Sequence, residues 1–385
     1  MYTRLLNPVP DHSYFLFGPR GTGKTTWIRS HYPESIYIDL LRTDIYTQLL
    51  ANPETLESYI PQDFNDFIII DEIQRIPELL NEVHRLIESP KHYKFILTGS
   101  SARKLRRQGV NLLAGRAYTY NIYPLTINEL GKDFDLKKVL RFGTLPAIYS
   151  KNDPHEYLQS YLSTYLEQEI NQEGMTRNLS AFYRFLQIAS YSQGSPVNTS
   201  SIAREVGIHS KVVDNYFTIL IDLLMGSFLP AFTRRAKRRL VSKPKFYLFD
   251  SGIYNTARPK GYLDKNSEID GISLETLFLN HLMAINEYSR LEYTFSYFRT
   301  ASGLEVDFIA YGPRGFHAFE IKLTKNIYSK HLKGLLAFSR DYPEAKLHLL
   351  YTGNIELYFG NITVSPIQNA LSNLAKILTQ DTVAT

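Results

Sequence analysis

The chain has 385 residues, of which 44% are apolar and 21% charged, with a net charge of +5 and no cysteine. This length predicts two or three domains, and the composition excludes a largely disordered chain, disulfide bonds and thiolate metal sites. No apolar run approaches the roughly 20 residues that cross a bilayer, and the first residues lack the apolar region of a signal peptide, so we expect a cytoplasmic protein without a membrane partner.

A glycine-rich loop follows the first predicted strand, which covers residues 13–17. The loop matches the pattern G-x-x-x-x-G-K-[ST], in which backbone N–H groups surround nucleotide phosphates, and a helix is expected to begin at its end. Lys24 is expected to reach the β- and γ-phosphates, and the Thr25 hydroxyl to bind Mg²⁺. The predicted nucleotide-binding residues of this segment are Gly18, Pro19, Arg20, Gly21, Thr22, Gly23, Lys24, Thr25 and Thr26.

Further strands are predicted at residues 35–39, 66–70 and 94–98, with helical stretches between them. This alternation predicts a parallel sheet, and ligands bind beyond the carboxyl ends of such strands. Asp71 and Glu72 follow four apolar residues, so we expect Asp71 to hold Mg²⁺ and Glu72 to polarise an attacking water.

Two further pairs of residues complete the predicted nucleotide site. Thr98 and Ser100 end the strand at 94–98, where a polar side chain either senses the γ-phosphate or caps the strand. Phosphoryl transfer also uses positive charge, often from an arginine. Arg103 and Arg116 are the candidates, acting within the chain or from a neighbouring subunit, and the alternative for each is an ordinary surface arginine.

The middle of the chain, residues 136–245, is predicted to be mainly helical, with a helix at 156–170 and another at 180–190. A helix-turn-helix is expected at 199–224, followed by two strands that form a wing around a dense basic cluster. This arrangement predicts DNA contact, while the alternative is a winged helix that serves as a lid or a protein contact. The predicted DNA-contact residues are Lys211, Asn215, Arg234, Arg235, Lys237, Arg238 and Arg239.

The C-terminal part combines a hairpin expected at 295–310 with a strand expected at 316–322. On these strands Asp307, Glu320 and Lys322 reproduce the D…ExK spacing of PD-(D/E)xK nucleases, although a valine replaces the usual proline before the aspartate. Asp307 and Glu320 would hold a divalent ion. Lys322 shares a strand face with Glu320 and would activate a metal-bound water or stabilise phosphorane charge. Live cleavage and an inert binding fold are both left open.

The chain resembles a widespread prokaryotic family of AAA-like P-loop ATPases with a C-terminal restriction-endonuclease-like, DUF4143-type domain. The segments that support this resemblance are GPRGTGKTT, FIIIDEIQRIPELL, KFILTGSS, LLAGRAYTYNIYPLTINEL, KPKFYLFDSGIYN, LETLFLNHL and LEVDFIAYGPRGFHAFEIKLTKN. It implies an α/β fold with an AAA+-like P-loop ATPase domain at 1–135, a helical and winged-helix segment at 136–245, and a PD-(D/E)xK nuclease-like domain at 246–385. The resemblance also implies ATP as the nucleotide. It further implies that Glu275, on a helix expected at 274–288, is an additional acidic residue of the metal site.

The preferred interpretation is therefore an Mg²⁺-dependent ATPase that uses its nucleotide cycle to act on DNA, which the nuclease-like domain would cut. The alternative is a nucleotide-switched binding or signalling protein whose C-terminal domain recognises DNA or a protein and cleaves nothing. A homo-oligomer or a protein partner is left open in both cases. A plain metabolic P-loop kinase is disfavoured, because such an enzyme does not need the residues that follow the nucleotide domain.

Overall fold

The structure, a computed structural model, describes residues 2–100, 113, 115–172, 178–234, 240–262 and 264–379. The chain divides into two compact units. The N-terminal unit comprises Thr3–Tyr123 and Asp222–Met225, and the larger unit comprises Met1–Tyr2, Pro124–Ile221 and Gly226–Thr385. Within the described ranges, no helix has both the length and the apolar character needed to cross a membrane.

The N-terminal unit is built on a five-stranded sheet in the order β2-β3-β4-β1-β5, and every neighbouring pair in it is parallel. The strands β1 and β3 are mainly apolar and buried along their whole length, and β4 is buried from Phe95 onward, as expected of strands covered on both faces. This confirms the parallel sheet and places each predicted strand within one residue of its expected bounds. The strands are β1 (Ser13–Phe17), β2 (Ile36–Asp39), β3 (Phe67–Asp71), β4 (Lys94–Gly99) and β5 (Ala117–Asn121).

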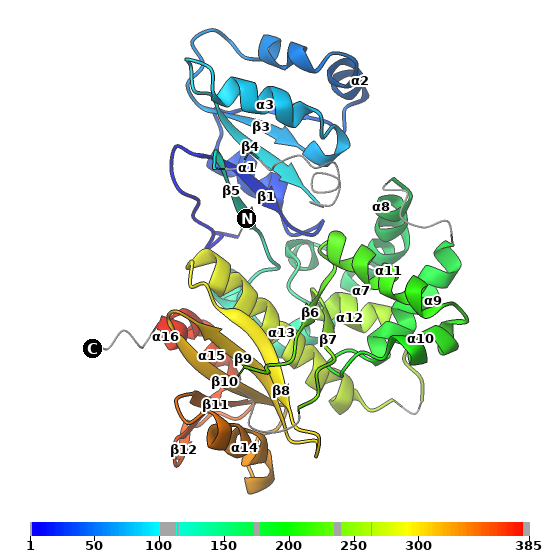
Figure 1. Ribbon diagram of the computed structural model, residues 1–385, viewed down its shortest axis with the longest axis vertical. Coiled ribbons are helices and arrows are strands. Elements are labelled where there is room, and N and C mark those ends of the chain that lie inside the picture. Colours follow the sequence, from blue (N-terminus) through cyan, green and yellow to red (C-terminus); the bar gives the residue numbers. More distant parts are fainter. Residues whose placement is uncertain are drawn as a thin grey trace. The chain divides into compact units, whose positions relative to one another are not determined.

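Helices cover this sheet, and α3 lies across β3 and β4 in Figure 1. The apolar residues of α3 recur at helical spacing, and Leu79, Leu80, Val83 and Leu86 all join the core of the unit. The helix therefore buries one stripe against the sheet, as an amphipathic helix does. The helices are α1 (Lys24–His31), α2 (Thr43–Ala51) and α3 (Leu79–Ile87), with 3₁₀ turns η1 (Pro53–Tyr59) and η2 (Ile73–Arg75).

The larger unit begins with a helical part. The helix expected at 156–170 is confirmed as a continuous helical run from Pro154 to Gln172, which a π-helical stretch, η5, divides into α7 and α8. Asp153 and Pro154 start α7 through a side-chain cap and a proline in the first turn. The elements are α5 (Ile127–Leu130), η3 (Gly131–Asp133), α6 (Leu136–Phe142), η4 (Pro146–Tyr149), α7 (Pro154–Ser160), η5 (Tyr161–Tyr165) and α8 (Leu166–Gln172).

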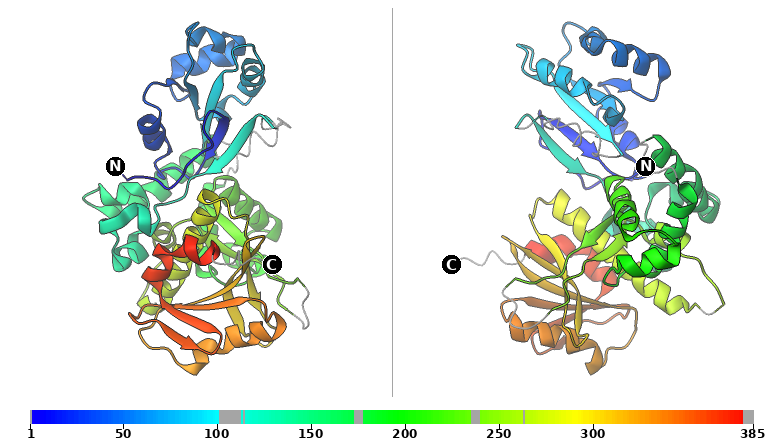
Figure 2. Two further views of the ribbon diagram at one scale, coloured as in Figure 1. Left: turned by 90° about the vertical axis from the view of Figure 1, so that its left-hand side faces the viewer. Right: turned by 45° about the vertical axis from the view of Figure 1, so that its right-hand side comes forward.

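Three helices and a two-stranded sheet follow, drawn mainly in green in Figures 1 and 2: α9 (Leu179–Tyr191), α10 (Thr199–Val206), α11 (Ser210–Asp222), β6 (Gly226–Leu229) and β7 (Lys245–Leu248). Aromatic contacts join α9 to α11, with ring centroids of Phe185 and Phe217 4.9 Å apart. Asn198 caps the start of α10, and Gly207, with φ 79°, ends it in a left-handed turn. The sequence thus specifies both ends of α10, and Gly207 begins the turn that leads to α11.

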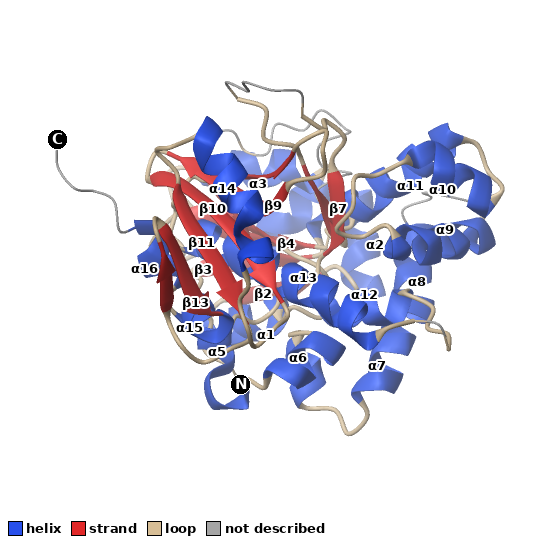
Figure 3. Cartoon of the chain, turned by 90° about the horizontal axis from the view of Figure 1, so that it is seen from below, coloured by secondary structure: helices blue, strands red, loops and turns tan. Residues whose placement is uncertain are grey.

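The rest of the unit is a mixed six-stranded sheet in the order β12-β13-β11-β10-β9-β8. The hairpin expected at 295–310 is confirmed as the antiparallel pair β8–β9. Helix α13 packs Phe278 on Phe319 of one face, while α14 packs Phe338 on the other face (Figure 3). The strands are β8 (Thr294–Arg299), β9 (Glu305–Gly312), β10 (Gly315–Lys322), β11 (Lys346–Tyr351), β12 (Leu357–Phe359) and β13 (Ile362–Pro366).

The helices of this part are α12 (Ser251–Ala257), α13 (Asn266–Tyr288), α14 (Lys333–Asp341), α15 (Ile367–Ser372) and α16 (Leu374–Thr379), with a 3₁₀ turn η6 (Ser329–Leu332). Helix α13 begins eight residues earlier than the sequence pattern predicted. Its buried residues include small and polar ones such as Ser273 and Thr276, which is why apolar periodicity alone underestimates its length.

Candidate functional site

The glycine-rich loop lies between β1 and the start of α1, which is the strand–loop–helix context that its sequence predicts. Gly21 and Gly23 have φ angles of 82° and 87°, in the left-handed region that favours glycine. Lys24 is buried, and its Nζ donates to the carbonyl oxygens of Gly18 at 2.6 Å and Pro19 at 3.1 Å. The loop therefore curls around the lysine ammonium. Of the remaining predicted residues, Thr22 is buried, whereas Arg20 and Thr26 are exposed.

The carboxylate of Asp71, at the end of β3, accepts hydrogen bonds from three hydroxyls. Thr25 donates to Oδ2 at 3.2 Å, Tyr37 donates to the same oxygen, and Thr98 donates to Oδ1. The carboxylate is buried, and its donors come from α1, β2 and β4. Thr25 and Asp71 thus bring hard oxygen atoms together next to the phosphate-binding loop, which fits a magnesium ion.

Tyr37 is a member of this site that the sequence analysis missed. Burial and the neighbouring Asp71 carboxylate raise the pKa of its phenol, so the hydroxyl keeps the proton that it donates. The guanidinium of Arg29 lies 4.3 Å from the centre of the tyrosine ring. A tyrosine at the second position of a strand has no local pattern that separates it from a packing residue, so the sequence offers no signal for this role.

Glu72 follows directly and adopts a left-handed conformation, with φ 61°. A non-glycine residue in this region costs about 1–3 kcal/mol, and such strain persists only where the surroundings impose it. The surroundings here are Thr98, whose Oγ1 accepts the Glu72 N–H at 3.3 Å, and Gln74, whose amide donates to the Glu72 carboxylate. Gln74 also donates to Ser100 Oγ at 3.2 Å. Gln74 was missed by the sequence analysis. Thr98 lies near the end of β4 and Ser100 directly follows that strand, and their role toward a γ-phosphate stays a prediction.

Only one of the two candidate arginines, Arg116, lies in the described part of the chain. Arg116 forms an ion pair with Glu88, and both side chains are more than one-third exposed. This arginine holds the pKa of Glu88 below its usual value. Arg103 lies outside the described residues. Its role stays a prediction.

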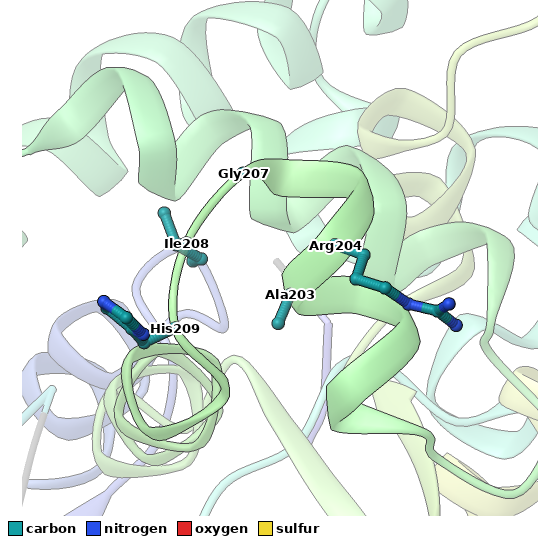
Figure 4. A pocket seen from close by; sticks show the side chains of 5 residues that line it. All are labelled: Ala203, Arg204, Gly207, Ile208 and His209. Carbon is teal, nitrogen blue, oxygen red and sulfur yellow. The ribbon is translucent and has the colours of Figure 1, made fainter.

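The candidate DNA-contact residues are only partly described. Lys211 and Asn215 are exposed, four residues apart on one face of α11. The turn before this helix borders a pocket lined by Ala203, Arg204, Gly207, Ile208 and His209 (Figure 4). Arg234 is exposed, with its guanidinium 4.9 Å from the ring centre of Tyr311. The other basic residues, Arg235, Lys237, Arg238 and Arg239, lie outside the described residues.

The predicted acid pair of the C-terminal sheet is assembled around a lysine. Lys322 Nζ lies 2.6 Å from Glu320 Oε1 and 3.8 Å from Asp307 Oδ2. Asp307 Oδ2 also accepts the Ile321 N–H at 2.8 Å, whereas Glu320 Oε2 is buried without a hydrogen-bond partner among the described residues. Burial and the Asp307 charge raise the pKa of Glu320. Burial opposes the charge of Lys322, but the two carboxylates outweigh it and raise the lysine pKa.

The third predicted acid, Glu275 on α13, is bound by a residue of β7. The Tyr247 hydroxyl donates to Glu275 Oε2 at 2.7 Å, and burial, aided by Asp307, raises the pKa of Glu275 to about 8. Lys245, two residues before Tyr247, is 1% exposed and pairs with Glu305. Among the described residues, no three histidine, cysteine, aspartate or glutamate side chains are arranged to hold a metal ion. The three acids therefore lie in one region without forming a three-ligand metal site.

Comparison with known families divides the chain into three matches. Residues 11–131 match an AAA domain, residues 133–264 a domain of unknown function called DUF8612, and residues 270–370 a domain of unknown function called DUF4143. Two uncharacterized proteins, from Mycobacterium bovis and Mycobacterium tuberculosis, are each 26% identical over 349 residues, which covers 88% of this chain and 76% of theirs. An uncharacterized protein of Methanocaldococcus jannaschii is 23% identical, over 64% of this chain and 62% of its own length.

Similarity to solved structures is weak. The Bacillus subtilis DNA clamp loader delta protein is 14% identical with a TM-score of 0.24, and the alignment covers 54% of this chain and 82% of that one. A DNA polymerase III gamma subunit-related protein of Thermotoga maritima is 12% identical, also with a TM-score of 0.24, over 55% and 92%. Scores this low support no inference about this chain. The match at residues 11–131 and the loop around Lys24 agree instead on one conclusion: the N-terminal unit contains an AAA-type, nucleotide-binding domain.

Proposed function

We propose that this protein is an Mg²⁺-dependent ATPase whose nucleotide cycle controls DNA binding or DNA cleavage by its C-terminal domain. The observation that supports it best is the Asp71 carboxylate, which accepts a hydrogen bond from Thr25 in the first turn after the phosphate-binding loop. A buried carboxylate and a hydroxyl at this place suit a magnesium ion that accompanies nucleotide phosphates.

The residues of the site divide the chemistry among them. The Lys24 ammonium, which donates to two loop carbonyls, would transfer these hydrogen bonds to β- and γ-phosphate oxygens. The Glu72 carboxylate would accept a proton from the attacking water. The Gln74 amide donates to one carboxylate oxygen of Glu72 and to the Ser100 hydroxyl, so it links the proposed base to a residue that can sense the γ-phosphate. Magnesium, when bound, would neutralise the charge that develops on the transferring group.

DNA contact rests on the middle segment. Lys211 and Asn215 offer an exposed cation and an amide on α11, and the sequence after β6 contains five arginines and lysines within residues 234–239. Such a group binds phosphates through charge, so its DNA affinity should fall steeply with salt. We propose that α9 to β7 act as the winged-helix DNA contact.

A second candidate function follows from the C-terminal cluster. The Lys322 ammonium already contacts both acids of the Asp307–Glu320 pair and offsets part of their charge, and no three-ligand metal group is formed in the described part of the chain. These observations favour a nucleotide-switched binding module whose nuclease-like domain recognises DNA or a protein without cutting.

ATP turnover tests the first part of the proposal. We expect Lys24→Ala to lose nucleotide binding, and Glu72→Gln to bind nucleotide but hydrolyse it at least about 100-fold more slowly. Lys91→Ala, an exposed lysine of the same unit, is the matched control and should leave turnover unchanged. Hydrolysis at the wild-type rate by Glu72→Gln would refute the assigned base.

DNA cleavage separates the two candidate functions. Plasmid and single-stranded DNA are incubated with the wild type and Lys322→Ala in Mg²⁺ or Mn²⁺, with and without ATP. Cleavage that depends on Lys322 and responds to ATP supports the nuclease. Intact DNA in all reactions, together with active ATP hydrolysis, supports the binding module.

A further inference from the structure

Tyr37 differs from the other hydroxyls around Asp71 in the distance that its side chain spans. In the pairing of β2 with β3, Asp39 is level with Asp71, and Tyr37 is level with Ile69. Tyr37 therefore lies two residues short of the carboxylate, which corresponds to about 6.6 Å along a strand. Its hydroxyl nevertheless donates to Asp71 Oδ2. Only a side chain as long as tyrosine brings a hydroxyl to the carboxylate from this position.

The tyrosine ring is itself held by the helix that follows the phosphate-binding loop. Thr25 and Arg29 are four residues apart in α1 and so share one face of it. Thr25 donates to the same Asp71 oxygen as Tyr37, and the Arg29 guanidinium lies 4.3 Å from the centre of the Tyr37 ring. One face of α1 thus contacts both the carboxylate and the tyrosine that orients it.

The two oxygens of Asp71 are consequently fixed from opposite sides. Thr98 holds Oδ1, and Tyr37 holds Oδ2 on the side that faces Thr25. The carboxylate is 6% exposed, so few waters replace a donor that is removed. Without the phenol, Oδ2 is held by Thr25 alone, and once the Thr25 hydroxyl binds a magnesium ion neither of its two donors still orients that oxygen.

We infer that Tyr37 is a positioning residue that orients the Asp71 carboxylate for the magnesium–nucleotide complex. The inference rests on the proposed function of the site, and it concerns a residue to which neither the loop pattern nor the domain matches assign a role. Partners of this kind, which touch a metal ligand and not the metal, typically change metal affinity by about 10–100-fold when removed.

The test measures how nucleotide binding depends on magnesium, with a fluorescent ATP analogue and the full chain. The variants are Tyr37→Phe, which removes only the hydroxyl, Tyr37→Ser, which keeps a hydroxyl of shorter reach, and Asp71→Asn. Tyr59→Phe is the matched control, because its phenol donates to Gln48 at 2.9 Å elsewhere in the same unit. Tryptophan fluorescence melting shows that each variant is folded, since Trp27 is the single tryptophan and lies in this unit.

We expect both Tyr37 variants to raise the magnesium midpoint about tenfold and to leave binding in EDTA unchanged. In the Asp71→Asn background, Tyr37→Phe should add nothing, because the tyrosine acts through that carboxylate; a purely structural role would persist there. A raised magnesium midpoint in Asp71→Asn together with an unchanged midpoint in the Tyr37 variants would overturn the inference alone. Additive shifts of the midpoint in the double variant would do the same. No shift in Asp71→Asn would overturn the inference together with the proposed role of Asp71.

Discussion

Replacement of Asp250 perturbs a buried contact between two segments of the larger unit. Asp250 is 1% exposed and precedes α12, where Oδ1 accepts the N–H groups of Gly252 at 2.8 Å and Ile253 at 3.2 Å. Its other oxygen accepts the N–H of Thr144 at 2.8 Å, from the segment after α6. Gly143 makes room for this contact, because a Cβ there would lie 1.8 Å from Asp250 Oδ1.

The expected losses of folding stability follow from these hydrogen bonds. Asp250→Ala removes the helix cap, worth about 0.5–2 kcal/mol, and leaves the buried Thr144 N–H without its acceptor, at about 1–3 kcal/mol. We therefore expect the free energy of unfolding to fall by about 2–5 kcal/mol. Asp250→Asn keeps an oxygen for the helix cap but turns an amide NH₂ toward the Thr144 N–H. Its only expected loss is therefore that of the acceptor for this N–H group.

The pH dependence of this contact has a definite sign. Burial raises the pKa of Asp250 to about 6, from its ordinary value of 3.8, although three backbone N–H groups oppose the rise. A carboxyl with a raised pKa in the folded state contributes stability that is present in acid and lost as the pH rises through about 6. The stability advantage of the wild type over Asp250→Asn should therefore shrink as the pH rises from about 4 to about 6 and change little above that.

Urea denaturation followed by circular dichroism measures these differences. Because Trp27 lies in the N-terminal unit, tryptophan fluorescence serves as the internal control and should give an unchanged transition in the Asp250 variants. A free energy of unfolding for Asp250→Ala within about 0.5 kcal/mol of the wild type, a difference typical of surface substitutions, would refute the assigned role of these hydrogen bonds. An Asp250→Asn variant less stable than Asp250→Ala would refute it as well.

Three further substitutions test two ion pairs and one close backbone contact. Lys322→Met should bind Mn²⁺ about tenfold more tightly in calorimetry without nucleotide, because the ammonium contacts both acids of the pair and repels a second cation; unchanged Mn²⁺ affinity would contradict that role. Lys245→Met should lower the free energy of unfolding by less than the about 3–5 kcal/mol of an uncompensated buried charge, because Glu305 keeps Arg299 as a second partner at 3.1 Å; a wild-type free energy of unfolding would show that the Lys245–Glu305 pair contributes nothing. Gly18→Ala should destabilise the N-terminal unit in fluorescence melting, because its Cβ would lie 2.5 Å from the Ile122 carbonyl oxygen; a wild-type melting temperature would exclude this clash.

The sequence predicted those parts of the nucleotide site that are formed by contiguous segments of the chain. The loop from Gly18 to Thr25 and the strand ending in Asp71 are contiguous segments whose spacing already determines their geometry, and the structure places Thr25 within 3.2 Å of Asp71. The same holds for Glu320 and Lys322, because alternation along one strand puts both on one face, and the structure pairs them at 2.6 Å.

The sequence did not predict the residues that complete these sites from other elements. Tyr37 reaches Asp71 from a neighbouring strand, and Tyr247 of β7 reaches Glu275, which lies 28 residues later in the chain on α13. Both contacts depend on strand register and side-chain length, which a single sequence does not reveal. A tyrosine in an apolar strand predicts packing, and only the fold shows that its hydroxyl ends at a carboxylate.

The two acidic sites differ in the charge of the groups that hold them, and this difference bears on their function. Asp71 is held by the neutral hydroxyls of Thr25, Tyr37 and Thr98, which orient the carboxylate and leave its negative charge available to a cation. Asp307 and Glu320 are held by an ammonium ion, so a divalent ion must compete with a cation that the chain supplies. Like charges at such short distances repel strongly where solvent is scarce. The magnesium concentration that supports nucleotide binding should therefore lie below the concentration at which any divalent ion binds the C-terminal pair, and Lys322→Met should narrow that gap.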